Sequence, residues 1–127
     1  MAVADIVHAP ASLAQPEFIN VATSARSRGL SLPRLLIEAC ARHAHKPAFT
    51  NLGHSLNYAD VERLSADLAA QFRAPRESGG VGLQPGERIA IMLPNLLQFP
   101  VVLLAALRAD LVVVLVNPMY TARELAH

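Results

Sequence analysis

Two asparagines, Asn95 and Asn117, are the polar residues best placed to meet a ligand. Asn95 follows the apolar run 87–93 and a proline, and Asn117 follows the apolar run 111–116 and precedes a proline. If the two runs are neighbouring parallel strands, both asparagines lie at the carboxyl ends of those strands, where open α/β sheets bind their ligands. Asparagine beside proline is also typical of ordinary turns. We expect both residues to lie in turns, with the rim of a ligand crevice as the alternative.

A glycine cluster, Gly79-Gly80-Val81-Gly82, is the second candidate for binding chemistry. Glycine-rich loops hold phosphate when they follow a strand and open a helix, because backbone N–H groups and the helix N-terminus then face the anion. This cluster follows a predicted helix and precedes a predicted strand, so its context is reversed. We therefore interpret it as a flexible surface loop.

The other reactive side chains do not form a catalytic set. His43 and His45 are two positions apart and face different sides of a predicted helix, so they cannot share a metal ion as a pair four apart would. Cys40 lies on the apolar stripe of the same helix and is expected to be a small buried hydrophobe. Three acidic residues are expected on the solvated face of the next helix: Asp60, Glu62 and Asp67. The sequence thus predicts no catalytic, cofactor-binding or metal-binding residue.

The composition excludes several classes of function. The 127 residues are 53% hydrophobic and carry 11 Lys+Arg against 10 Asp+Glu, a net charge of +1. This balance argues against a nucleic-acid-binding protein, because few counterions would be released on binding. The single cysteine excludes an internal disulfide and a cysteine-based zinc site. Polar residues and prolines interrupt the apolar region 89–116, so we expect no transmembrane segment and a cytoplasmic location, with peripheral membrane contact left open.

The hydrophobic pattern predicts three helices, a hairpin and two strands. The first helix spans 31–46, with Ser31 as its cap and Pro47 as its stop, and a hairpin with a turn at 51–54 follows over 47–58. Asn57 and Asp60 form a capping box that opens a second helix, which ends at Pro75. After a loop at 74–86 come a strand at 87–93, a helix at 97–109 and a strand at 111–116. Residues 1–30 show no sustained period and are expected to be an irregular lead-in.

Each predicted helix has an apolar stripe that should face the core. The inward positions are Leu32, Leu35, Leu36, Ala39, Cys40 and His43 in the first helix, Val61, Leu64, Leu68 and Phe72 in the second, and Phe99, Leu103, Ala106 and Leu107 in the third.

The strand, helix and strand between 87 and 116 predict a βαβ unit with parallel strands, and hence a layered α/β fold. Both strands are apolar at nearly every position, so each face of the sheet needs a covering layer. Thr121 and Glu124 form a further capping box just before the last residue, His127. Burying residues 111–116 would contribute roughly 8–15 kcal/mol, as much as a whole domain's net stability. We therefore expect a piece of a larger protein that is marginally stable or aggregation-prone when isolated.

A series of short segments resembles the N-terminal region of the adenylate-forming acyl-CoA synthetases. The segments include Pro85-Gly86-Glu87-Arg88-Ile89-Ala90, Leu93-Pro94-Asn95, Leu107-Arg108-Ala109 and the run 116–125. Residues 93–100 and 117–125 are most similar to the long-chain fatty acid branch. The resemblance implies the N-terminal portion of the large α/β domain of that fold, with residues 31–127 as an incomplete AMP-binding domain.

The resemblance also implies a ligase. Such enzymes activate a fatty acid with ATP and Mg²⁺ to an acyl-adenylate and pass the acyl group to coenzyme A. The family's phosphate-binding loop, acidic metal-binding residues and lysine-bearing lid match no position here, so no residue role is transferred and the isolated chain is expected to be inactive.

Two positions depart from the family pattern. Asp110 stands where the family usually has glycine in a left-handed helix cap, and Leu115 where the long-chain branch usually has asparagine. The alternative function is a stand-alone α/β module that binds a partner through an exposed sheet edge. A lipid-surface segment is a third possibility, which the net charge of +1 does little to support.

Overall fold

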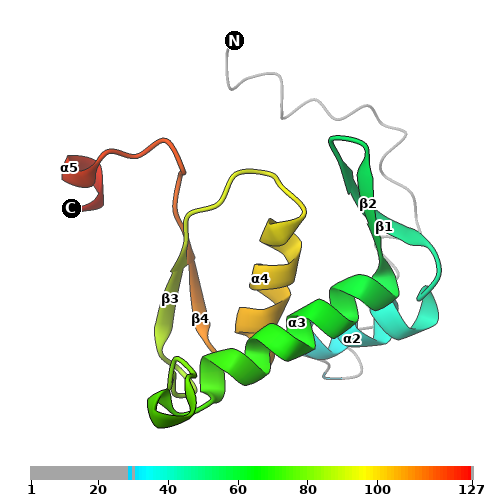
Figure 1. The fold of residues 1–127 in the computed structure, drawn as a ribbon, viewed down its shortest axis with the longest axis horizontal. Coiled ribbons are helices and arrows are strands. Elements are labelled where there is room, and N and C mark those ends of the chain that lie inside the picture. The colour runs from blue at the N-terminus through cyan, green and yellow to red at the C-terminus, as the bar shows by residue number, and fades with distance from the viewer. Residues whose placement is uncertain (1–28, 30, 127) are drawn as a thin grey trace. The chain divides into compact units, whose positions relative to one another are not determined.

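The computed structural model describes residue 29 and residues 31–126, and the described residues from Leu32 onward form one compact unit (Figure 1). Its fold is mixed α/β, with one antiparallel hairpin and one parallel strand pair, as the sequence predicts. The predicted lead-in, 1–30, lies outside the described residues except for Gly29. The elements are α2 (Leu32–Arg42), β1 (Pro47–Asn51), β2 (His54–Asn57), α3 (Tyr58–Arg73), the 3₁₀ turn η3 (Arg76–Ser78), β3 (Arg88–Ile91), α4 (Gln98–Arg108), β4 (Val112–Leu115) and α5 (Ala122–Leu125).

Helix α2 ends at Arg42, four residues before the predicted end at Lys46. The carbonyls of Ala44 and Lys46 accept hydrogen bonds from the backbone N–H groups of Ala59 and Tyr58, at 3.0 and 3.1 Å. These N–H groups belong to the first turn of α3, where no partner exists within the helix. The helix therefore ends before residues 44–46, because the carbonyl groups of Ala44 and Lys46 accept hydrogen bonds from the first N–H groups of α3.

The hairpin turn lies at residues 51–54, as predicted. Asn51 pairs with His54 as the last rung, so the loop contains only Leu52 and Gly53. Both have positive φ, 47° and 79°, as a two-residue hairpin turn of the I′ type requires. Residues 51–54 are thus the four residues of the β-turn, and leucine occupies one of its two central, left-handed positions.

Helix α3 begins with the predicted capping box. The Asn57 side chain accepts from the Asp60 N–H at 2.7 Å, and the Asp60 carboxylate accepts from the Asn57 N–H at 3.2 Å. The buried line of the helix is Val61, Ser65 and Ala69, whereas the predicted positions Leu64, Leu68 and Phe72 are half-buried. The centre of the surface that α3 buries is thus formed mainly by small side chains, and the larger side chains lie on either side of it.

Helix α4 is buried on more than one side. Its buried residues are Val101, Leu104, Ala105 and Ala106, and of the predicted inward positions only Ala106 is among them. The helix contacts β3 and β4 as well as α2 and α3. The buried surface of α4 is therefore wider than the single predicted stripe. The predicted positions Phe99, Leu103 and Leu107 are half-buried and lie beside the fully buried residues.

The end of α4 confirms the expectation of a left-handed cap at Asp110, which has φ 56°. The Leu111 N–H donates to the Ala106 carbonyl at 3.0 Å and the Asp110 N–H donates to the Leu107 carbonyl at 3.2 Å. This is a Schellman motif with aspartate at the position where glycine is usual. The Asp110 carboxylate also lies 3.7 Å from the Arg73 guanidinium of α3.

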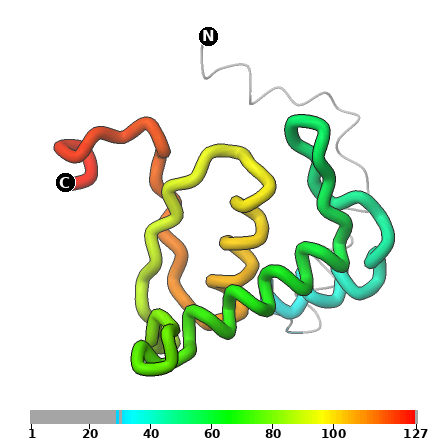
Figure 2. Tube along the Cα trace, viewed as in Figure 1, coloured from blue at the N-terminus to red at the C-terminus, as the bar shows by residue number. Residues whose placement is uncertain are grey.

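Strands β3 and β4 are parallel, as predicted, with Arg88 opposite Val112 and Ile91 opposite Leu115. Figure 2 shows the chain running along β3, returning through α4 and then running along β4 in the same direction as along β3. Ile89, Leu111 and Val113 pack on the core that α3 and α4 share. On the other face Val112 and Val114 are 48% and 43% exposed, so within the described residues only one face of the sheet is covered.

Candidate functional site

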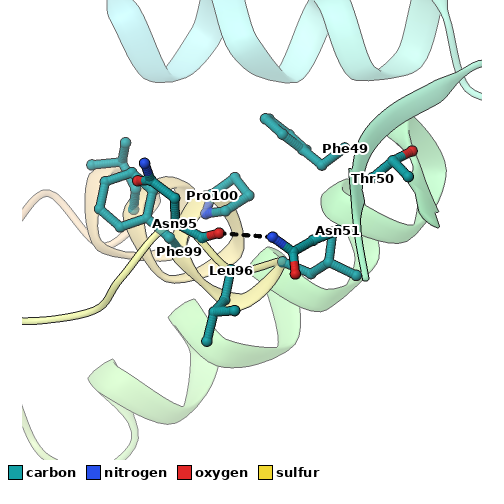
Figure 3. Close-up of a pocket in the computed structure, with 9 residues that line it drawn as sticks. Phe49, Thr50, Asn51, Asn95, Leu96, Phe99 and Pro100 are labelled. Atoms are coloured by element: carbon teal, nitrogen blue, oxygen red, sulfur yellow. Dashed lines mark hydrogen bonds between the residues drawn. The ribbon is translucent and has the colours of Figure 1, made fainter. Parts of the chain in front are cut away.

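An apolar pocket of about 500 Å³ lies where the β1–β2 hairpin meets the start of α4 (Figure 3). The Asn51 side chain of β1 donates to the Asn95 backbone carbonyl at 2.9 Å, which joins the hairpin to the turn after β3. Six apolar side chains and three uncharged polar ones line the pocket: Phe49, Leu96, Leu97, Phe99, Pro100 and Leu103, with Thr50, Asn51 and Asn95.

The structure separates the two asparagines that the sequence singled out. Asn95 lines the pocket, in the turn between β3 and α4. Asn117 lies in a turn after β4, where its side chain accepts from the Met119 N–H at 2.9 Å and its carbonyl from the Tyr120 N–H at 3.0 Å. Asn117 is therefore a turn residue, and Asn95 is both a turn residue and part of a pocket.

Sequence reasoning missed the hairpin side of this pocket. Asn51 and Asn95 are 44 positions apart, and Phe49 belongs to a strand predicted only as a hairpin arm. No spacing rule links residues across such a separation. The lining contains no ionisable side chain, so it cannot transfer protons, but it can surround an apolar group.

A charged pair lies in the core contact between α3 and α4. The Arg108 guanidinium pairs with the Glu62 carboxylate, and their side chains are 13% and 34% exposed. The prediction that Glu62 lies on a solvated face was wrong, because the rotation of α3 turns this residue towards α4. The Arg108 Nη1 atom is buried and has no hydrogen-bond partner among the described residues.

The other two acidic residues of α3 differ in their roles. Asp60 is half-buried and caps its helix through the Asn57 N–H. Asp67 is exposed and lies 3.8 Å from the Arg63 guanidinium, one turn away on the same helix. Only Asp67 matches the expectation of a solvated face.

Cys40 is buried at 5% exposure, as predicted, in a cluster with Val61 and Leu104. Burial raises the pKa of its thiol above the ordinary value of 9.0, and the negative charge of Glu62 raises it further. Arg108 acts in the opposite direction as the smallest of the three causes. A buried thiol kept protonated in this way is a poor nucleophile and a poor metal ligand.

The histidines that the structure describes, His43, His45 and His54, belong to no group of metal-ligating residues. The His43 ring lies beside Tyr58, with ring centroids 5.9 Å apart. Among residue 29 and residues 31–126, no three His, Cys, Asp or Glu side chains are grouped closely enough to hold a metal ion.

The glycine cluster follows the end of α3, as predicted, and is bonded to it. The N–H groups of Val81 and Gly82 donate to the carbonyls of Gln71 and Ala74 at 3.0 and 2.9 Å. A Cβ on Gly80 would lie 2.1 Å from the Ala74 carbonyl oxygen, so only glycine fits there. These N–H groups satisfy the last carbonyls of α3 and are not free to hold a phosphate.

Comparison with known proteins shows the family. The family model described as AMP-binding enzyme matches residues 36–127. The chain belongs to the AMP-binding enzyme family. This agrees with the resemblance found in the motifs.

Curated relatives include members of the long-chain fatty acid branch. It is 45% identical over 97 residues to the long-chain-fatty-acid–CoA ligase of Salmonella typhimurium, and 44% identical over 97 residues to that of Yersinia pestis. Each match covers 76% of this chain and 16% of the relative. Triostin synthetase I of Streptomyces triostinicus is 35% identical over 115 residues, covering 85% of this chain and 20% of that protein.

Solved structures confirm the fold. Apo MbtA of Mycobacterium smegmatis superposes with a TM-score of 0.61 at 30% identity, covering 86% of this chain and 20% of that one. Apo MatB of Rhodopseudomonas palustris gives a TM-score of 0.56 at 28% identity, covering 71% and 18%. The chain thus spans about one-fifth or less of the length of each of these relatives.

No helix in the described part of the chain is long and apolar enough to cross a bilayer.

Proposed function

We propose that this chain is the N-terminal scaffold of an ATP-dependent long-chain fatty acid–CoA ligase. The observation that carries the proposal is the 44–45% identity to long-chain-fatty-acid–CoA ligases over 97 residues. The reaction would join the fatty acid carboxylate to AMP with release of pyrophosphate. The coenzyme A thiol would then displace AMP and form the thioester.

The described residues do not themselves fit ATP, Mg²⁺ or coenzyme A. The backbone N–H groups of Val81 and Gly82 are already bonded to α3. The pocket lining carries no charge, and no acidic cluster exists among residues 31–126. We therefore assign the chain a structural part in the reaction, and the groups that bind nucleotide and metal to the remainder of the longer enzyme.

The uncovered sheet face supports the same assignment. Val112 and Val114, on the face opposite the core, are 48% and 43% exposed. Parallel sheets in α/β proteins are covered on both faces. In the longer enzyme this face would be buried, and the isolated chain would lack both the cover and the catalytic groups.

A chimera tests the proposal. Residues 31–127 would replace the matching segment of the Salmonella typhimurium long-chain-fatty-acid–CoA ligase, and AMP release would be measured with palmitate, ATP, Mg²⁺ and coenzyme A. We expect activity within about tenfold of the parent enzyme, equivalent to a loss of about 1.4 kcal/mol. The isolated chain should remain at background. A chimera that folds but is inactive, or turnover by the isolated chain, would overturn the proposal.

The exposed face also favours a second candidate, a module that pairs with a partner through the sheet. The edges of β3 and β4 that do not pair with each other offer N–H and carbonyl groups to another strand. Size-exclusion chromatography separates the two functions. A defined oligomer supports the module, whereas polydisperse association supports the enzyme scaffold.

The cytoplasmic location stays a prediction, and so does peripheral contact with a membrane. Neither is needed for the scaffold role.

A further inference from the structure

We propose that Asn51 is a positioning residue, whose carboxamide fixes the turn between β3 and α4 for the reaction of the longer enzyme. This role rests on the proposed function above and deepens it, because it gives one particular side chain a part in the reaction. Asn51 lies on the hairpin and acts through the Asn95 carbonyl, so it does not need to touch the reacting groups.

The hydrogen bond from Asn51 joins two distant parts of the chain. Its Nδ2 atom lies 2.9 Å from the Asn95 carbonyl oxygen, 44 positions away in the sequence (Figure 3). Among the described residues, the only other side-chain hydrogen bond that joins residues more than eight positions apart is the pair of Arg108 with Glu62. Asn51 is thus the one described hairpin residue whose side chain forms a hydrogen bond to the turn.

The turn has little support of its own. Residues 92–97 lie between β3 and α4, and Pro94 has no N–H to donate. Leu97 precedes α4 and offers no side-chain hydrogen bond to the first N–H groups of that helix. Inside the turn the Leu96 N–H donates to the Pro94 carbonyl at 2.8 Å. The bond from Asn51 is the one side-chain hydrogen bond that other described residues make to this segment, so its loss should let the turn shift.

The turn directly follows the carboxyl end of β3, which runs parallel to β4. Open α/β sheets bind their ligands outside the carboxyl ends of the strands. A displacement of about 1 Å in groups that place a substrate can lower a rate about a hundredfold. Residues 92–97 include no ionisable side chain, so the turn contributes through its position and not through proton transfer.

The variant Asn51→Asp in the Salmonella typhimurium chimera tests this role. Aspartate keeps the shape of asparagine but replaces the N–H donor with an oxygen, which the Asn95 carbonyl repels. We expect kcat with palmitate to fall about tenfold, while KM for palmitate and for ATP stays within about twofold. A residue that only stabilised the hairpin would change the amount of folded chimera and not the kcat of each folded molecule.

Ser55→Ala is the matched control. The Ser55 hydroxyl oxygen lies 2.7 Å from the Thr50 hydroxyl oxygen. This variant therefore also removes one exposed side-chain hydrogen bond of the hairpin, but none that reaches the turn. It should leave kcat within about twofold of the parent chimera.

Hydrogen exchange of the full chain, followed by NMR, gives a second measurement that needs no activity. The amides of Leu96 and Phe99 donate hydrogen bonds to the Pro94 and Leu96 carbonyls, at 2.8 and 3.1 Å. Their exchange should become at least about threefold faster in Asn51→Asp and stay unchanged in Ser55→Ala.

Either an unchanged kcat or unchanged exchange rates in Asn51→Asp would overturn the positioning role. A Ser55→Ala variant that loses as much kcat as Asn51→Asp would overturn it as well. A parent chimera without activity would overturn the proposed function instead, and the exchange rates would then decide whether Asn51 holds the turn.

Discussion

At the scale of single residues, the core contact between α2, α3 and α4 contains a thiol and an ion pair. Cys40 is buried where the stripe of its helix predicts. Glu62 is not on the solvated face, because the smaller residues Ser65 and Ala69 occupy the centre of the α3 contact and rotate the helix. A hydrophobicity pattern favours the larger side chains and so misplaces this rotation.

A double-mutant cycle would measure the pairing of Glu62 with Arg108. Arg108 is only 13% exposed, so Glu62→Gln leaves a nearly buried cation without a countercharge. We expect a coupling free energy of at least about 1 kcal/mol from urea unfolding of Glu62→Gln, Arg108→Met and the double variant. The exposed pair Arg63 and Asp67 is the control and should give less than about 0.5 kcal/mol. Equal couplings in the two cycles would contradict the burial argument.

The Cys40 thiol makes stability depend on alkaline pH. Its pKa is raised in the folded chain, so the folded state retains the proton that the unfolded state loses. This contribution is complete below the unfolded pKa near 9.0 and is lost as the pH rises through the folded pKa. We expect wild type to lose stability relative to Cys40→Ala above pH 9, measured by urea unfolding at several pH values. A difference that stays constant with pH would show that the thiol is not desolvated.

At the scale of elements, signals that act within a few residues were predictable. The capping box of Asn57 and Asp60 and the left-handed cap at Asp110 depend on neighbours no more than five residues away, and both are present. The end of α2 and the hairpin side of the pocket depend on contacts across 12 or more positions, such as Tyr58 with Lys46 and Asn51 with Asn95. Local chemistry does not encode those contacts, so the sequence did not predict them.

The hairpin turn offers a stabilising substitution. Leu52 is 87% exposed and has φ 47°, a conformation that disfavours leucine and suits asparagine. Leu52→Asn creates the Asn-Gly pair preferred in this turn and should raise stability by about 1 kcal/mol. Thermal unfolding would measure the gain. The control Leu52→Ala removes the same exposed side chain but keeps an ordinary Cβ, so an equal gain from alanine would point to lost apolar exposure and not to turn geometry.

At the scale of the whole molecule, the two faces of the parallel sheet differ. Val113 packs on the core, whereas Val112 and Val114 are exposed on the opposite face of the same strand. The fold class and the parallel pairing were predictable from the apolar runs. The sequence did not predict which face of the sheet the described residues leave exposed, because every position from 111 to 116 is apolar.

This asymmetry predicts how the chain associates. Val112→Thr with Val114→Thr keeps β-branched side chains but makes the open face more polar, so association should fall while unfolding shifts by less than about 1 kcal/mol. Multi-angle light scattering and a thermal melt would measure the two effects. The control Val113→Thr places a hydroxyl in the core and should cost about 1–3 kcal/mol. If the double variant still associates, the surface responsible for association is not the open face of the sheet.

The centre of the contact between α3 and α4 is built from small side chains, which have few atoms left to remove. Ser65, Ala105, Ala106 and Ala109 have 0% exposure, and Ala69 has 8%. Truncation there deletes at most a methyl or a hydroxyl group, while any enlargement must push two helix backbones apart. Saturation mutagenesis of these five positions should therefore show that glycine and serine are tolerated and that valine, leucine and phenylalanine are not. The opposite order is usual in a core filled with large aliphatic residues.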